Sequence, residues 1–329
     1  MSTAEVFVQG LRSFTAYLHQ CGDSYGEWRQ IQVGPLEGRK TGSAWILHMS
    51  SLAMSNLWHL LHILLPALAR EEQVEELLID GLADADITRL RQSLAWPFLE
   101  ALGDPQVLGL GLPGRRCYGR ALWGYEAVSL FGRHKGRPLP QAAQRLRSIF
   151  GAPRLPRTPR LLLAERRAGA RRVANAAALH ELLAALPLRI TAADLGKWSV
   201  VEQWRMASGA RILLGAHGAG LAWAAFMEVG SVLVELMPYM KVLHQQLCRV
   251  KPGEVVAWDA TPMYAYGGLA LVAQLHHACI LGLPGPRAPQ SLGADLATWW
   301  SSSILVDLKA VNSTLRTAMR LLNTWRRGS

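Results

Sequence analysis

A glycine-rich turn built around a histidine is the part of the chain whose residue types best suit chemistry. It follows a short apolar run at 212–214, and the apolar residues 221–227 come after it. An apolar run that ends at a glycine is typical of a buried parallel strand, and small residues let the backbone approach a ligand closely. The following run predicts a short helix whose free N-terminal amides face the turn. We therefore expect a phosphate-binding turn made of Gly215, His217, Gly218, Ala219 and Gly220.

An acidic residue is expected to lie beside this turn. Residues 231–236 predict a second buried strand, with Glu235 near its carboxyl end. Ligands of open α/β sheets bind at the carboxyl ends of the strands, so Glu235 and the turn should share one crevice. His217 can donate to a phosphate oxygen or, when protonated, bring it a positive charge. The alternative is a histidine that caps the helix or binds a backbone carbonyl, but its small neighbours favour the ligand role.

Two arginines and an asparagine follow another apolar run, at 161–163. These three residues are spaced four positions apart. They are Arg167, Arg171 and Asn175. Guanidinium groups and helix-terminus amides can stabilise a developing phosphate charge without a metal ion. The alternative is that both arginines are surface residues of an arginine-rich chain. The order of these residues before the histidine turn favours the anion-binding role.

These segments resemble the C-terminal domain of glycosyltransferase family 61. Residues 215–236, GAHGAGLAWAAFMEVGSVLVEL, are similar to the family's turn around a histidine and its strand ending in glutamate. Residues 161–175 are similar to its strand followed by two arginines and an asparagine, and residues 200–211 to the helix before the turn. Residues 56–68 and 117–124 match more weakly. The resemblance is nearest to the branch that adds N-acetylglucosamine to O-mannosylated protein, within a group that includes EGF-domain GlcNAc-transferases and plant xylosyltransferases.

The resemblance implies an α/β, GT-B-like fold, with two Rossmann-like domains facing a cleft. It also implies an inverting transferase that moves a sugar, N-acetylglucosamine or xylose, from a UDP-sugar to a hydroxyl of a glycan or glycoprotein. The arginines, Asn175, the histidine turn and Glu235 would then bind the donor. No cofactor or metal ion is expected: the cysteines form no C-x-x-C pair, and Asp84-Ala-Asp86 lies outside a strand-end context.

The residue that would take the proton from the acceptor is less clearly marked. Ile63 stands where the resemblance implies an aspartate, four residues beyond His59. An inverting transferase needs a base for the attacking hydroxyl, and isoleucine cannot serve. His59, His62 and Asp80 are the catalytic candidates, although each also has a structural explanation. A catalytically inactive relative that binds glycans or partners is therefore an alternative function.

Length and charge indicate two domains. The chain of 329 residues predicts an N-terminal, acceptor-side α/β domain at 1–155 and a nucleotide-sugar-binding domain with a terminal helix at 156–329. Residues 133–172 hold twelve Lys or Arg and one acid, so their net charge of +11 equals that of the whole chain. Proline spacing favours an extended linker for most of this segment. Nucleic-acid binding is a second alternative, but no interleaved aromatics or zinc ligands support it, and we expect no nucleic-acid partner.

The sequence gives little information about disulfide bonds and about the cellular compartment. The even number of cysteines, four, permits disulfides without requiring them. Residues 41–69 lack charged side chains, but their histidines, serines and asparagine argue against a transmembrane helix. No signal peptide stands at the N-terminus. The family resemblance implies the lumen of the endoplasmic reticulum or Golgi, whereas the missing signal indicates an incomplete sequence or a cytosolic relative.

Alternating apolar patterns predict the elements that position these residues. The last predicted helix begins near Ala294 and has basic residues among its apolar positions; in two-domain transferases such a helix often packs back onto the first domain. A membrane-bound amphipathic helix is the alternative. Strands are expected at 44–49, 77–80, 107–110, 121–122, 161–163, 188–191, 212–215 and 231–236, and helices at 57–69, 85–102, 175–186, 200–209 and 221–227.

Overall fold

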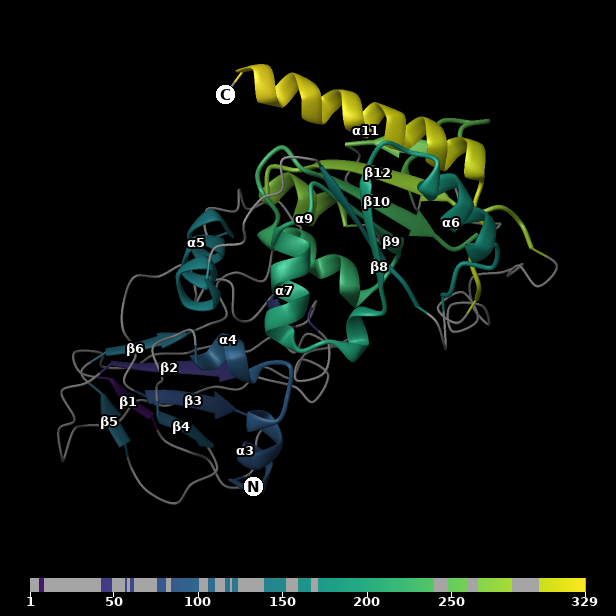
Figure 1. Cartoon of the computed structure of the whole chain (residues 1–329). Helices are drawn as coiled ribbons and strands as arrows, with labels where there is room; N and C mark the ends of the chain where they lie inside the picture. Colours follow the sequence, from purple (N-terminus) through teal and green to yellow (C-terminus); the bar gives the residue numbers. More distant parts are fainter. Residues whose placement is uncertain are drawn as a thin grey trace. The chain divides into compact units, whose positions relative to one another are not determined.

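The computed structural model describes two compact units, which are Met1–Ser129 with Arg137–Gly151 and Leu130–Gly136 with Ala152–Ser329. We call them the first and the second unit (Figure 1). The residues described are 6–8, 43–48, 57, 60–61, 76–80, 84–100, 106–109, 116–118, 120–123, 139–151, 159–166, 171–239, 248–259, 266–285 and 302–328.

The first unit is built on a parallel sheet of four strands in the order β4-β3-β2-β6. A second, two-stranded sheet pairs β1 with β5 in parallel. The predicted alternation of strands and helices is therefore confirmed where the chain is described. The strands are β1 (Val6–Val8), β2 (Ser43–His48), β3 (Glu76–Asp80), β4 (Gln106–Gly109), β5 (Arg116–Tyr118) and β6 (Arg120–Trp123), and the helices are α3 (Asp84–Arg91), α4 (Trp96–Glu100) and α5 (Leu139–Phe150).

The helix predicted for 85–102 is interrupted. The hydroxyl of Ser93 donates to the carbonyl of Leu90 and accepts from the amide of Ala95, at 2.7 and 3.1 Å. A serine side chain that bonds neighbouring backbone groups competes with the helical pattern. Pro97 also lacks the amide needed to continue a helix, but it is tolerated in the first turn of α4. The chain therefore forms two helices, α3 and α4, instead of one.

Part of the predicted linker is a helix. α5 begins with Pro140 in its first turn and buries Ala142, Ala143 and Leu146. Phe150 at its end packs edge-to-face against Phe98 of α4, with ring centroids 6.4 Å apart. The linker interpretation of 139–150 was wrong because the four-residue spacing of Ala142, Leu146 and Phe150 makes an apolar stripe. Residues 152–158, where the predicted domain boundary falls, lie outside the described residues.

The second unit contains a mixed six-stranded sheet in the order β11-β12-β10-β9-β7-β8. Every neighbouring pair is parallel except β11 with β12 at one edge. The α/β class and the four strands predicted in this half are confirmed. The strands are β7 (Arg160–Ala164), β8 (Arg189–Ala193), β9 (Ile212–Ala216), β10 (Val232–Met237), β11 (Val256–Trp258) and β12 (His276–Leu281).

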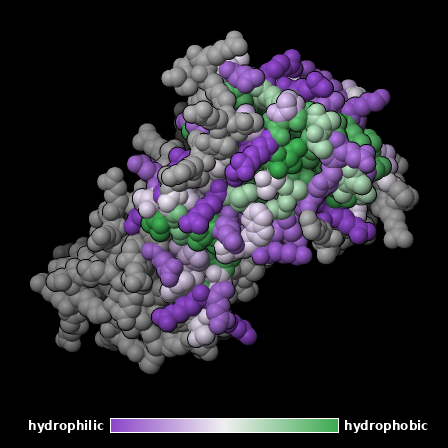
Figure 2. All heavy atoms as spheres, in the orientation of Figure 1, coloured by the Kyte–Doolittle hydropathy of each residue, from purple (hydrophilic) through white to green (hydrophobic). Residues whose placement is uncertain are grey.

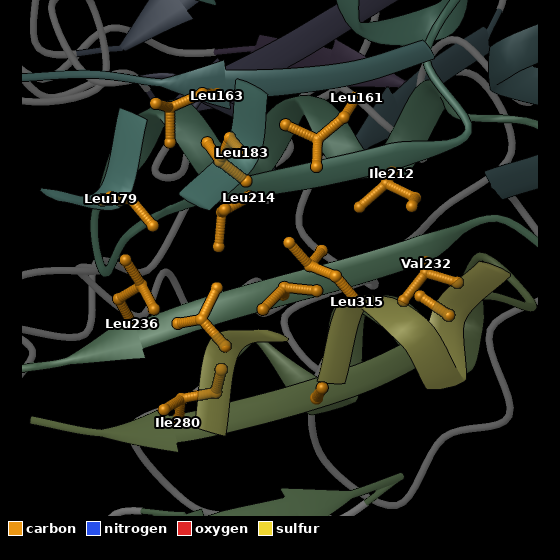
Figure 3. Close-up of a cluster of buried hydrophobic side chains, with 14 of the residues drawn as sticks. Leu161, Leu163, Leu179, Leu183, Ile212, Leu214, Val232, Leu236, Ile280 and Leu315 are labelled. Atoms are coloured by element: carbon orange, nitrogen blue, oxygen red, sulfur yellow. The ribbon is translucent and has the colours of Figure 1, made fainter. Parts of the chain in front are cut away.

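Helices cover both faces of this sheet (Figure 1). α6 (Ala176–Ala184) and α11 (Leu308–Gly328) lie on one face, while α7 (Val200–Ser208), η2 (Ala219–Phe226) and α9 (Gly267–Val272) lie on the other. η1 (Leu195–Lys197) precedes α7. Under α6 and α11, apolar side chains of the strands form the main core, in which Leu161, Leu214, Leu236 and Leu315 meet (Figure 3). Burying such side chains contributes roughly 1.5–3 kcal/mol each.

The terminal helix packs on the sheet of its own unit. α11 starts at Leu308, later than predicted, and buries Val311, Leu315, Ala318 and Leu322 in the main core. The second unit's sheet thus occupies the apolar face of the helix, and the packing of the helix onto the first domain stays a prediction. Membrane binding would need the same apolar face, which is buried in the main core. Hydrophilic side chains line the outer side of α11 (Figure 2). Within the described chain, no helix is long and apolar enough to cross a bilayer.

A disulfide links β12 to residue 248. Cys248 and Cys279 are bonded, both are fully buried, and 31 residues separate them in the sequence. They pack with Met237, Val250 and Leu281 on the face of the sheet opposite to α11. The sequence permitted a disulfide without pointing to this pair, since the two cysteines are brought together only by the sheet.

We expect the double substitution Cys248→Ala/Cys279→Ala to lower the free energy of unfolding by about 3 kcal/mol, because a closed loop restricts the unfolded chain. Urea unfolding of the variant and the parent measures the difference. Peptide mapping without reductant should show the two cysteines in one cross-linked pair. Recovery of both peptides as separate free thiols would refute the link.

Candidate functional site

The histidine turn has the backbone that the sequence predicts. β9 ends at Ala216, and the amide of His217 still donates to the carbonyl of Leu236 in β10, at 2.9 Å. Gly218 then adopts a φ of +152°, and η2 begins directly after it. A side chain is strained at this φ, and a Cβ here would also clash with the Arg166 guanidinium. The backbone conformation therefore favours glycine at 218, and a larger residue would also displace the end of the Arg166 side chain.

The other small residues of the turn have different roles. A Cβ at Gly215 would lie 3.0 Å from the Cβ and the carbonyl oxygen of Ala164, so this glycine lets β9 and β7 pair closely. At Gly220 the nearest atom would be 3.6 Å away, which is ordinary contact. Ala219 and Gly220 are partly exposed at the start of η2. The short helix predicted after the turn is confirmed, but it is a 3-10 helix.

η2 is held in place by α7. Ser199 accepts from the amide of Glu202, and the Glu202 carboxylate accepts from the amide of Ser199, so a capping box fixes the start of α7. Gln203 on that helix accepts from the indole N–H of Trp223 in η2, at 2.8 Å, and donates to the carbonyl of Trp198. Both ends of one buried amide are thus used to orient the helix that follows the turn.

Two arginines meet at Gly218. Arg166 lies against it, and Nη1 of Arg171 is 3.4 Å from the position that a Cβ on Gly218 would take. Burial, together with the positive charge of Arg166, lowers the pKa of the Arg171 guanidinium to about 10. Arg171 remains protonated at neutral pH, so two positive charges face one glycine turn. Such a pair favours an anion between or beside its members.

The pair differs from the one that the sequence predicts. Arg167 lies outside the described residues, whereas Arg166, which sequence reasoning missed, contacts the turn. Arg166 is the second residue after β7, and Arg171 adopts a left-handed backbone with φ +60°. Because residues 166 and 167 are adjacent, sequence spacing alone does not decide which of them faces the turn.

Glu235 receives three hydrogen bonds behind the turn. Its Oε1 lies 2.5 Å from Nδ1 of His217, and its Oε2 lies 3.0 Å from Nε2 of His277. The amide of Tyr266 also donates to Oε2, at 2.8 Å. The Glu235 carboxylate is fully buried, and the ring of Tyr266 packs edge-to-face against His217. The predicted convergence of Glu235 on the histidine turn is observed, whereas His277 and Tyr266 were missed.

These contacts keep Glu235 ionised. Burial raises the pKa of its carboxyl, but the hydrogen bonds with His217 and His277 outweigh this effect and lower the pKa to about 2. Burial, together with the negative charge of Glu235, raises the pKa of the Tyr266 phenol well above its ordinary value. The site therefore holds one buried carboxylate, one neutral phenol and histidines bound to the carboxylate.

A cavity of about 350 Å³ opens beside the turn, where β7 and β9 end. Its position at the carboxyl ends of parallel strands is where α/β sheets bind ligands. At its edge Glu165 forms an ion pair with His180 of α6. The lining residues are Leu163, Ala164, Glu165, Arg166, Arg171, Arg172, Val173, Ala176, Leu179, His180 and Ala216.

Asn175 has a structural task. Its side-chain amide donates to the carbonyl of Val306 at 2.9 Å and accepts from the amide of Val306 at 3.0 Å. Backbone bonds of Ile304 with Arg172 and Ala174 extend this contact. Asn175 thereby ties the start of α6 to the segment before α11. Its predicted contact with the donor stays a prediction.

The catalytic candidates are not brought to this site by any described contact. His59, His62 and Ile63 lie outside the described residues. Asp80 ends β3 in the first unit, in register with His48 of β2. Of the residues that the structure describes, no group of His, Cys, Asp and Glu is arranged to hold a metal ion. The catalytic roles of His59, His62 and Asp80 stay predictions.

We expect Asn175→Ala to lower the free energy of unfolding by about 1–3 kcal/mol, since it leaves the buried amide and carbonyl of Val306 without their partner. Urea unfolding measures this change. Asn323→Ala, at an exposed position of α11, is the control and should be neutral. Unchanged stability of Asn175→Ala would remove the structural role and favour the predicted contact with the donor.

Comparison with known proteins assigns the chain. The sequence profile described as Glycosyltransferase 61 matches residues 57–234, which is more than half of the chain and includes Arg166, Arg171 and the histidine turn. No curated protein matches the chain. The matched segment ends one residue before Glu235, so the network behind the turn extends beyond it. On this evidence the chain belongs to the glycosyltransferase 61 family.

Proposed function

We propose that this protein transfers a sugar from a UDP-sugar, with inversion, to a hydroxyl of a glycan or glycoprotein. Membership of the glycosyltransferase 61 family supports sugar transfer. The observation that carries the donor assignment is the pair Arg166 and Arg171, which face the Gly218 turn at the carboxyl ends of β7 and β9. N-acetylglucosamine and xylose are the donor sugars that the family resemblance favours.

The site suits the departure of a nucleoside diphosphate. The acceptor oxygen attacks the anomeric carbon while the bond from that carbon to the β-phosphate oxygen breaks, so negative charge grows on the diphosphate. Arg166 and Arg171 would stabilise that charge as paired guanidinium groups, and His217, when both of its ring nitrogens carry a proton, would donate a hydrogen bond to it from Nε2. Groups held in place before the reaction are effective, because they need not reorganise as the charge develops. No metal ion is required by this scheme.

The acceptor proton must go to a base, and His59, His62 and Asp80 are our candidates for it. We also propose that the first unit supplies the acceptor side of a GT-B-like arrangement. A relative that binds the donor without transferring the sugar is the alternative, motivated by Ile63 in place of an acid. The two differ in an assay: the alternative predicts normal UDP-sugar binding with neither transfer to an acceptor nor donor hydrolysis.

The disulfide bears on the compartment. Stable disulfides form in the oxidising lumen of the secretory pathway and are rare in the cytosol. The buried pair Cys248 and Cys279 therefore supports our proposal that the protein acts in the endoplasmic reticulum or Golgi lumen.

Titration with UDP tests the donor site. We expect UDP to bind more tightly than ADP or GDP, with or without a divalent cation, by isothermal titration calorimetry. Arg166→Ala and Arg171→Ala should each weaken UDP binding about 10- to 100-fold, because a hydrogen bond to a charged group contributes about 1.5–3 kcal/mol. Arg171→Lys keeps the charge without the two-pronged geometry and should fall between the parent and Arg171→Ala.

The control for these variants is Arg205→Ala, which removes an exposed arginine from α7 and should leave the affinity unchanged. Thermal denaturation confirms that every variant is folded. Failure of the folded parent to bind UDP at millimolar concentration would refute the proposed donor.

A further inference from the structure

A second histidine supports Glu235 from the side opposite to His217. His277 lies on β12, whose residues 277 and 279 pair with Leu233 and Glu235 of β10. Side chains two residues apart on a strand share a face, so His277 and Glu235 are diagonal neighbours on one face of the sheet. Only 2% of the His277 side chain is exposed. It lies beyond the segment that the family profile matches.

The hydrogen bonds determine which nitrogen of each histidine carries a proton. An ionised carboxylate only accepts, so both nitrogens that face Glu235, Nδ1 of His217 and Nε2 of His277, must donate. The other nitrogen of His277, Nδ1, is buried and has no hydrogen-bond partner in the described part of the chain. A proton placed there would bury a charged donor without a partner, which is costly. His277 is therefore the neutral tautomer that donates from Nε2.

Each oxygen of Glu235 has a separate task. Oε2 is held by His277 and by the amide of Tyr266, which leaves Oε1 for His217. Two donors on one oxygen oppose rotation of the carboxylate, so Oε1 stays where His217 needs it. His217 then keeps its proton on Nδ1, and its Nε2 is the ring nitrogen that Glu235 does not hold.

We propose that His277 is a positioning residue for His217, acting through Glu235 to fix the tautomer and the ring orientation of His217 at the Gly218 turn. Carboxylates that orient an imidazole in this way are common wherever one ring nitrogen must be directed at a ligand. The consequence for UDP binding rests on the function proposed above, whereas the consequence for the tautomer does not.

Core packing alone does not explain why His277 is buried beside Glu235. A buried ion costs several kcal/mol to desolvate, and apolar residues of similar volume often replace buried charged groups without loss of stability. The same face of β12 carries Cys279 and Leu281 within an apolar cluster, so an apolar residue at 277 would suit the surroundings. The chain instead places a donor there, directed at the carboxylate that holds His217.

Three substitutions of His277 separate its hydrogen bond from its volume. His277→Leu removes the donor, and His277→Asn places an amide too short to reach Oε2, so both should free the carboxylate. His277→Gln places its amide nitrogen where Nε2 stands and should restore the bond. The matched control is His276→Leu: this neighbour on β12 faces the other side, and its contact is with Asp259, 3.6 Å away, and not with Glu235.

The experiment records ¹⁵N–¹H correlations of the imidazole rings in protein labelled at its ten histidines, with His217 assigned by the signals lost in His217→Gln. The parent, His276→Leu and His277→Gln should show His217 protonated on Nδ1. His277→Leu and His277→Asn should show a mixture of tautomers. UDP affinity should fall about 5- to 10-fold in those two variants, as expected from loss of one hydrogen bond, and stay within about twofold in His277→Gln.

Unchanged His217 signals in a folded His277→Leu or His277→Asn variant would overturn the positioning role. Failure of His277→Gln to restore the parent pattern would overturn it too, since volume rather than the hydrogen bond would then matter. His277→Asn carries the test if His277→Leu does not fold. If the parent does not bind UDP but the tautomers respond as described, the positioning role stands and the proposed donor is wrong.

Discussion

The burial of the Glu235 carboxylate constrains the second unit more than any other single interaction. An ion that is removed from water needs several donors close by, and here they come from three places: the residue after β9, the start of β12 and the residue before α9. These segments lie far apart in the sequence, so the carboxylate is satisfied only when the parallel sheet is in register. Formation of the sheet and assembly of the site are thus one event.

The two faces of the six-stranded sheet have different roles. The face under α6 and α11 is apolar and supplies the main core. Along each strand, residues of this face, such as Leu214 and Leu236, alternate with residues of the other face. That alternation places Gly215 and Glu235 together on the opposite face, since both strands have the same register. A slip of one residue would move Glu235 into the apolar core. The register that buries the leucines is therefore also the one that positions the carboxylate.

Local patterns were the part of this arrangement that could be predicted. β9, the histidine turn and β10 follow from apolar runs separated by glycines, and the family resemblance follows from the same residues. His277 and Tyr266 could not be found this way, because what marks them is a contact with Glu235 across 42 and 31 residues. Arg166 was missed for a different reason: its neighbour Arg167 offers the same chemistry, and the choice between them depends on how the chain leaves β7. α5 was missed because prolines and arginines outweighed a clear apolar stripe.

The charge arrangement explains why the carboxylate stands behind the histidine and not beside the arginines. Arg166 and Arg171 both bring positive charge to Gly218, which suits an incoming anion. A carboxylate in the same place would pair with them and compete with that anion. Glu235 instead holds Nδ1 of His217 with one oxygen, while its other oxygen accepts from His277 and from the Tyr266 amide. The chain thus keeps an acid close enough to orient His217 and shielded enough to leave the turn attractive to phosphate.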